Sequence, residues 1–262
     1  MKKSLLYLSV LTSIFLVSCD GYNKLLKSSN YELKLERANQ YYQKANYIKA
    51  TGLYEELIPV YKGTDKAEEI YYYYSYCNYY QGDYALSQFH FKNYYRNFPA
   101  GKHAEECLFM NAYCYYLNSP AYRLDQTDTK NAMAELQNFI DQYPESSRID
   151  SCNKIYDLLR GKLEKKEYDI TLQYFHISDY KAAIANSKNF MKEFPESPKI
   201  DELLYVTINS YYLLAVNSLE SKKLERLNLA MESYLKLLDL YPKSNFLSKS
   251  ESIYESCQKM KT

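Results

Sequence analysis

The chain of 262 residues carries 33 basic and 32 acidic side chains, so its formal net charge is +1. Such a balanced charge argues against a sequence-independent nucleic-acid binder, which needs a clustered basic face. Only 6 glycines occur, and the apolar residues are spaced by three and four, which favours α-helix throughout.

The first 18 residues predict a cleaved signal peptide. Lys2 and Lys3 precede an apolar run from Leu5 to Val17, which is too short to span a bilayer. The run leads into Cys19 and resembles the bacterial lipobox, which implies that this cysteine is acylated, palmitate included, and anchors the protein to a membrane. An ordinary signal peptide that happens to carry a cysteine is the alternative. An aspartate directly after the acylated cysteine, as Asp20 is here, retains a lipoprotein at the inner membrane in some bacteria. The choice between inner and outer membrane therefore stays open.

From residue 31 onward, clusters of turn residues divide the chain into predicted helix pairs. The pairs are 31–45 with 47–61, 65–81 with 83–98, 102–118 with 129–143, 147–177 with 179–194, and 199–218 with 222–241. A short closing helix is expected over 245–260. The stretch 147–177 can be one bent helix or two, because Gly161 allows both.

One pattern returns in every pair. A small residue recurs in each second helix, at Ala50, Ser87, Ala132, Ala183 and Ala230. Eleven residues later stands an aromatic residue, at Tyr61, Phe98, Tyr143, Phe194 and Tyr241, and a proline follows the last four. This pattern resembles the tetratricopeptide repeat (TPR), with lengthened repeats. We therefore expect an all-α fold, a right-handed superhelical array of about five TPR helix pairs with a concave groove.

A closer resemblance rests on three features together: the lipobox, the five stretched repeats and the loop Ser119–Thr129 (SPAYRLDQTDT). The chain is similar to the BamD-like lipoproteins of the outer-membrane β-barrel assembly machinery, in a Bacteroidetes-type branch, from Cys19 to about Lys249. The resemblance implies a non-enzymatic scaffold, lipid-anchored to the outer membrane and facing the periplasm. It also implies docking on the periplasmic domains of the barrel insertase, contact with other assembly subunits and reception of unfolded outer-membrane proteins.

The expected organisation has four segments. They are a lipoprotein signal peptide over 1–18, a lipidated linker over 19–30, N-terminal repeats 1–3 over 31–143, and C-terminal repeats 4–5 with the closing helix over 144–262. By the resemblance, the N-terminal repeats receive the client and the C-terminal repeats dock on the insertase.

The first helix of each pair lines the groove in TPR proteins, which selects a set of candidate client-binding residues. They are Glu69, Tyr72, Tyr76, Tyr79 and Tyr80 in the second repeat and Glu106, Phe109, Tyr113 and Tyr116 in the third. Tyrosine offers a flat apolar face and a hydroxyl group that can bond a peptide backbone, which suits the alternating aromatics of a barrel strand. The alternative is that these rings only pack between helices, as we expect for Tyr71 and Tyr74.

The loop of the third repeat is a second candidate surface, for contact with a partner subunit. Its candidate residues are Tyr122, Arg123, Asp125 and Gln126. Arg123 is the residue expected to make a charged contact. The structural alternative is a capped helix start, with Thr127 or Asp128 as the capping residue.

No catalytic or cofactor-binding motif is present in the sequence. A Gly-rich phosphate loop, a Cys-x-x-Cys pair, a His-Glu-x-x-His motif and a Gly-x-Ser-x-Gly motif are all missing. His103 and Cys107 share a helix face, but two ligands do not make a zinc site. We therefore expect no enzyme activity, no cofactor and no metal.

The remaining cysteines and charges predict structural roles. Five cysteines follow the lipobox, an odd number without the spacing of a disulfide-stapled fold. Cys77 and Cys114 occupy equivalent places in two repeats and are expected to pack as small apolar residues. The charged run 162–167 predicts a solvated helix face with salt-bridge spacings.

A rival function uses the same fold. The chain can be a TPR lipoprotein scaffold for other cell-envelope complexes, in division or wall remodelling. A glycan-capturing lipoprotein is a third alternative, but such proteins show tryptophan platforms and this chain has no tryptophan. The identity of the bound partner distinguishes these functions.

Overall fold

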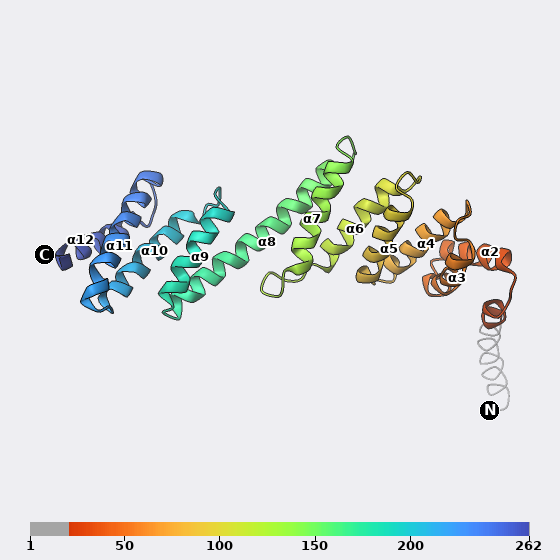
Figure 1. The fold of residues 1–262 in the computed structure, drawn as a ribbon, viewed down its shortest axis with the longest axis horizontal. Helices are drawn as coiled ribbons and strands as arrows, with labels where there is room; N and C mark the ends of the chain where they lie inside the picture. Colours follow the sequence, from red (N-terminus) through yellow and green to blue (C-terminus); the bar gives the residue numbers. More distant parts are fainter. Residues whose placement is uncertain (1–20, 262) are drawn as a thin grey trace, which may run out of the picture. The chain divides into compact units, whose positions relative to one another are not determined.

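The part of the chain that the structure describes is built from helices (Figure 1). The computed structural model describes residues 21–261, so the predicted signal peptide and the lipidation of Cys19 lie outside the described residues. After a helical segment at 21–26 come α2 (Tyr31–Gln43), α3 (Tyr47–Val60), α4 (Ala67–Tyr80), α5 (Tyr84–Asn97), α6 (Ala104–Asn118), α7 (Thr127–Gln142), α8 (Ile149–His176), α9 (Tyr180–Glu193), α10 (Ile200–Val216), α11 (Glu220–Leu240) and α12 (Leu247–Lys261). Between residues 21 and 261 there is no strand, which confirms the predicted all-α fold.

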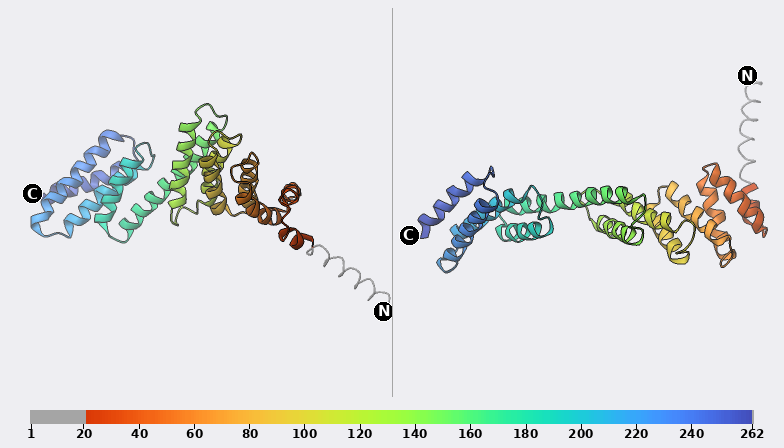
Figure 2. Two further views of the ribbon diagram at one scale, coloured as in Figure 1. Left: turned by 45° about the vertical axis from the view of Figure 1, so that its right-hand side comes forward. Right: turned by 90° about the horizontal axis from the view of Figure 1, so that it is seen from above.

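Consecutive helices pack against each other in the predicted pairs, α2 with α3 through α10 with α11, and α12 closes the series (Figure 2). The fold is therefore a TPR-type array of helix pairs. The stretch 147–177 forms one continuous helix, α8. Gly161 lies exposed within α8, where glycine costs only about 1 kcal/mol relative to alanine.

Three of the turns within the pairs share one mechanism. Gly82 adopts a left-handed φ of 79°, and the amide of Asp83 donates to the carbonyl of Asn78 at 3.1 Å, which ends α4. The Asp83 carboxylate then accepts from the amide of Leu86 at 3.0 Å and begins α5. The same arrangement recurs at Ala45-Asn46 and Ser178-Asp179, where non-glycine residues take the left-handed conformation.

The small repeat positions are buried where two helices approach closely. The residues Ala50, Ser87, Ala132, Ala183 and Ala230 are at most 1% exposed. Ser87 replaces alanine without leaving its hydroxyl group unpaired, because its Oγ donates to the carbonyl of Ser75 at 3.1 Å. The predicted close-packing role of this position is confirmed.

The chain divides into two compact units. Unit 1 holds the chain up to Ala121 together with Asp125–Leu159, and unit 2 holds Tyr122–Leu124 together with the chain from Arg160 onward. Helix α8 therefore contributes its first part to unit 1 and its second part to unit 2. The predicted domain boundary between residues 143 and 144 stays a prediction.

An acid–serine contact closes three of the repeats. The hydroxyl group of Ser146 donates to the carboxylate of Glu105 at 2.5 Å. That of Ser197 donates to Glu164 at 2.5 Å, and that of Ser244 donates to Asp201 at 2.7 Å. In each case the serine follows the second helix of the pair and the acid lies on the first. Two of these acids are the second residue of their helix, whereas the acid of the fourth pair lies inside α8.

Candidate protein-binding surfaces

Three of the predicted client-binding residues, Tyr72, Tyr76 and Glu106, meet at the start of α6. The carboxylate of Glu106 accepts hydrogen bonds from the hydroxyl groups of Tyr76 at 2.5 Å and Tyr72 at 3.1 Å. The ring of His103 stacks on Tyr72, with the ring centres 3.9 Å apart. Burial first, and then the bond to Glu106, raise the pKa of Tyr76, so its hydroxyl group remains a donor.

This hydrogen-bonded set is largely internal. Tyr76 is 8% exposed and Phe109 is also 8% exposed. Phe109 stacks on Tyr113 with ring centres 5.7 Å apart, and the Arg148 guanidinium lies 4.8 Å from the ring centre of Phe109. These contacts stabilise the packing of α4 on α6 and of Arg148 on α6, and binding of a client by Tyr76 and Phe109 stays a prediction.

Four other predicted tyrosines have a different environment. Tyr79, Tyr113 and Tyr116 are half-buried and Tyr80 is 49% exposed. Within residues 21–261, no hydrogen bond engages the hydroxyl groups of these four residues. We call Tyr79, Tyr80, Tyr113 and Tyr116 the open-hydroxyl tyrosines. They offer apolar ring faces and unused hydrogen-bonding groups.

The neighbouring residues separate into surface and core. Glu69 is exposed at the start of α4, one residue before the buried Ile70. Tyr74 is 7% exposed, which confirms its predicted core position. Tyr71 is half-buried, and its hydroxyl group lies 3.0 Å from Nδ1 of His90.

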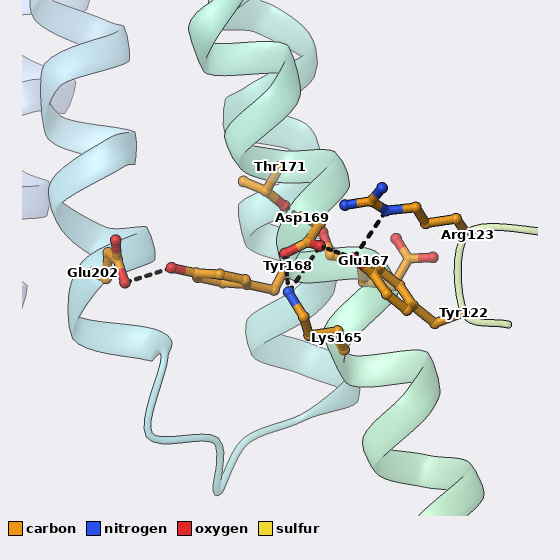
Figure 3. A network of polar contacts seen from close by, with 8 residues as sticks. All are labelled: Tyr122, Arg123, Lys165, Glu167, Tyr168, Asp169, Thr171 and Glu202. Atoms are coloured by element: carbon orange, nitrogen blue, oxygen red, sulfur yellow. Dashed lines mark hydrogen bonds and ion pairs between the residues drawn. The ribbon is translucent and has the colours of Figure 1, made fainter.

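In unit 2, part of the predicted partner-contact loop is fastened to α8 (Figure 3). The hydroxyl group of Tyr122 donates to Asp169 at 2.8 Å, and Nε of Arg123 donates to the same hydroxyl oxygen at 3.0 Å. Lys165 contacts both carboxylate oxygens of Asp169, at 2.6 and 2.8 Å. Lys166 donates to the carbonyl of Leu124 at 2.6 Å.

The hydrogen-bond donors of this network favour the ionised form of Asp169. Partial burial opposes ionisation of Asp169, but the bonds from Lys165 and Tyr122 outweigh it and lower the pKa of this carboxyl group. The run 162–167, predicted as a solvated helix face with salt-bridge spacings, also holds the loop through Lys165 and Lys166. The i,i+4 spacing of Lys165 and Asp169 was the available signal.

A pocket of about 500 Å3 opens beside this network in unit 2. Its lining includes Tyr122, Arg123, Lys166, Ile170 and His176. The lining carries two cations, Arg123 and Lys166, the apolar side chain of Ile170, and the carboxylate of Asp169, which Lys165 already pairs. Such a pocket can accept an apolar side chain with a carboxylate beside it.

The other two predicted loop residues have structural roles in unit 1. The Asp125 carboxylate accepts from the amide of Thr127 at 2.9 Å. Gln126, which is 5% exposed, bonds the carbonyl of Ala121 at 3.0 Å and the hydroxyl group of Thr129 at 2.7 Å. The expected capping residue is thus corrected, because α7 begins at Thr127 and Asp125 accepts from the amide of this first residue.

The described residues offer no metal site and no membrane span. No group of three or more His, Cys, Asp or Glu side chains between residues 21 and 261 is arranged to hold a metal ion. None of the helices described is both long and apolar enough to cross a bilayer. The described cysteines, Cys77, Cys107, Cys114, Cys152 and Cys257, are free and buried. Cys77 and Cys114 pack without exposure, as predicted.

The helix pairs and the two surfaces define a helical-repeat protein of the TPR class, a class built to hold other chains. The chain matches the family model described as YfiO, an outer membrane lipoprotein, over residues 30–227 and 169–259. The match spans nearly the whole described chain. The chain therefore belongs to this family of outer membrane lipoproteins.

Relatives of known name agree with this assignment. The outer membrane protein assembly factor BamD of Buchnera aphidicola subsp. Acyrthosiphon pisum is 24% identical over 213 residues, which cover 76% of this chain and 85% of that protein. The factor of the same name from Caulobacter vibrioides is 23% identical over 126 residues, 48% of this chain and 41% of that protein.

Solved TPR domains are more distant. The TPR2AB domain of yeast Sti1, in a complex with pHSP90, is 10% identical with a TM-score of 0.41, covering 88% of this chain and 99% of that domain. The TPR domain of P58(IPK) is 12% identical with a TM-score of 0.42, covering 92% of this chain and 68% of that domain. Both TM-scores are low, so the fold assignment rests on the helix pairs themselves.

Proposed function

We propose that this protein is a non-enzymatic, lipid-anchored subunit that acts in the assembly of β-barrel proteins at the periplasmic side of the outer membrane. The observation that carries the proposal is the family match from residue 30 to residue 259, with relatives that are named assembly factors. The lipobox-like sequence before Cys19 supports the anchor.

The open-hydroxyl tyrosines of unit 1 are the proposed contact for unfolded outer-membrane proteins. Their rings lie close together, with 5.4 Å between the ring centres of Tyr79 and Tyr80 and 5.7 Å between those of Tyr113 and Tyr116. An extended barrel strand carries apolar and aromatic side chains at alternate positions. Its backbone N–H and C=O groups are unpaired until it joins the barrel. The ring faces suit its side chains, and the free hydroxyl groups suit its peptide groups.

The pocket beside Arg123 is the proposed contact for the insertase. The Arg123 side chain is exposed, and within the described residues only its Nε is hydrogen-bonded. The two terminal guanidinium nitrogens can therefore bind a carboxylate in a bidentate manner. Because the loop is fastened by Tyr122 and Lys166, the guanidinium group is held in place before a partner arrives.

A mild-detergent pull-down of the acylated protein from outer membranes, with mass spectrometry of the bound proteins, tests the assembly role. Recovery of a barrel insertase with periplasmic repeat domains supports it. Recovery of wall or division proteins without an insertase favours the rival scaffold function. Arg123→Glu should reduce insertase recovery at least tenfold, whereas Lys130→Glu, an equal charge change at an exposed site on α7, should not.

Client contact is tested separately, by photo-crosslinking. A photo-reactive residue at Tyr80 or Tyr116 should crosslink to an unfolded barrel protein, and one at Phe89, which is 57% exposed on α5, should not. Equal crosslinking from all three positions would count against the open-hydroxyl tyrosines. For the anchor, Cys19→Ala should move the protein from the membrane to the periplasmic fraction, and an unchanged membrane fraction would contradict lipidation.

A further inference from the structure

The first described residues of the chain form a short helical segment, 21–26, that packs on the first helix pair of unit 1. We call it the docked segment. Its side chains Tyr22, Leu25 and Leu26 lie half-buried against the core to which α2 and α3 contribute. Polar contacts fasten the docked segment at both of its ends.

Tyr22 fastens the start of the docked segment. Its hydroxyl group donates to the carbonyl of Lys49 on α3 at 2.9 Å, and its ring contacts Tyr41 on α2, with ring centres 5.7 Å apart. Nζ of Lys49 lies 5.4 Å from the centre of each of these two rings. Tyr22 therefore joins the docked segment to both helices of the first pair.

Lys34 of α2 fastens the other end of the docked segment. This lysine is only 3% exposed, and its Nζ donates to the carbonyl of Leu26 at 2.7 Å and pairs with Glu56 of α3. The carbonyl groups at the end of a helix lack partners within that helix, so a buried lysine is a suitable donor there. The docked segment is thus held to the array over its whole length.

Gly52 supplies the seat for Tyr22. It lies inside α3, where glycine is less favourable than alanine, and a Cβ atom there would come within 2.7 Å of the Tyr22 hydroxyl oxygen. The corresponding positions of the other four repeats are exposed and carry a side chain, at Phe89, Ala134, Ala185 and Glu232. The docked segment therefore accounts for this glycine, whereas the packing of the repeats does not.

The docked segment begins two residues after Cys19, which limits how far the first helix pair can move from that residue. Three residues of extended chain, from Cys19 to Tyr22, span at most about 11 Å. We propose that the docked segment is a short, fixed tether that holds the first helix pair of unit 1 against the lipid surface, with Gly52 as the seat of Tyr22. The proposal rests on the proposed function for the acylation of Cys19 alone. Ile48, which precedes Lys49 and is 75% exposed, then lies close to the lipid headgroups.

The test measures how closely the first helix pair approaches the bilayer. A fluorophore is attached to the acylated full chain at Ile48→Cys, and the described native cysteines are buried from the reagent. The protein is reconstituted into phosphatidylcholine vesicles that carry a nitroxide on the headgroup, and strong quenching is expected. Tyr22→Ala frees the segment as far as Leu26 and raises the reach from Cys19 to about 25 Å, so quenching should fall at least about twofold. Phe89→Ala, which removes an exposed ring from α5, should leave it unchanged.

Two changes at the seat exclude unfolding as the cause. Gly52→Ala favours α3 as a helix but collides with the Tyr22 hydroxyl group, so it should reduce quenching as Tyr22→Ala does. Tyr22→Phe removes that oxygen, and the ring carbon that carried it is 4.0 Å from the added Cβ atom. The double variant should therefore restore the quenching of the otherwise unchanged protein.

Two results would overturn the tether. Unchanged quenching in both Tyr22→Ala and Gly52→Ala would show that the seat does not hold the first helix pair to the bilayer. This result leaves the assembly role standing, because recovery of an insertase does not involve the seat. A protein with native Tyr22 and Gly52 that fails to attach to the vesicles would instead contradict the acylation of Cys19, and with it both the anchor and the tether.

Discussion

The contact of Glu106 with Tyr76 and Tyr72 gives the sharpest prediction about stability. Replacing Glu106 by alanine leaves the hydroxyl group of Tyr76, in a residue only 8% exposed, without its acceptor. A hydrogen bond to a charged group contributes about 1.5–3 kcal/mol when one partner is removed. Tyr72 is half-buried and can turn to water, so it adds less than about 1 kcal/mol. We expect a total loss of about 3 kcal/mol.

A double-mutant cycle separates the hydrogen bond from other effects. Tyr76→Phe removes the hydroxyl group and should cost about 1–2 kcal/mol alone, but almost nothing once Glu106 is already alanine. The free energy of unfolding is measured by urea titration with far-UV circular dichroism, and the fit must allow a separate transition for each compact unit.

The control for this cycle is Glu36→Ala, because Glu36 is an exposed acid on α2 that bonds only Gln40 of its own helix. It should change stability by less than about 0.5 kcal/mol. If Glu106→Ala costs no more than this control, or if the two single changes simply add, the hydrogen bond between Glu106 and Tyr76 does not stabilise unit 1.

Three further predictions concern turns, thiols and pH. Ser178→Gly should raise the free energy of unfolding by about 0.5–1 kcal/mol, because φ is 64° there, and Gly82→Ala should lower it by about 1 kcal/mol or more; equal effects of both changes in a melting experiment would refute this. The five buried thiols, with pKa values raised by burial to about 11 at Cys152 and Cys257, should react with a thiol reagent only after unfolding; rapid labelling of the folded protein would contradict their burial. Burial lowers the pKa of His90 to about 4, so the unfolded state binds more protons and stability should fall as pH drops from about 6.5 to 4. The loss should stay below about 3 kcal/mol, since the ring is not completely buried, and His90→Phe should flatten it, as urea titrations at several pH values can test.

The fold could be predicted because each repeat places the same kinds of residue at the same positions of its helix pair. A small residue where helices touch, an aromatic residue eleven positions later and Gly82-Asp83 at a turn are local signals. They place the helix ends within a few residues of those observed. The left-handed turns at Ala45 and Ser178 could not be foreseen, because neither residue prefers that conformation and tertiary packing imposes it.

The candidate surfaces were less accessible to prediction. Sequence position placed Tyr76 and Tyr113 in the same class, yet one hydroxyl group is bonded to a carboxylate thirty residues away and the other is not. The partners of a side chain across helices depend on rotamers and crossing geometry, which a helical period does not encode. Likewise, Lys166 gave no sequence signal for its bond to the loop at Leu124.

The acid–serine contact also shows how α8 is composed. In the other two pairs with this contact the acid is the second residue of the first helix, as Glu105 is in α6, so Glu164 corresponds to an internal helix start within α8. Asp150 occupies the same second position at the true beginning of α8, fourteen residues earlier. The second part of α8 thus serves as the first helix of the fourth pair, and the first part of α8 packs in unit 1.

The division of α8 between the two units determines where the protein can be dissected. Cys152 and Leu159 are fully buried in the core of unit 1, although they precede the internal start at Glu164. A fragment that ends after α7 would lose these side chains and expose their apolar partners to water, whereas one that ends near Gly161 keeps them. Stable laboratory fragments, and any naturally shortened chains of this kind, are therefore expected to end in the middle of α8 and not in the loop after α7.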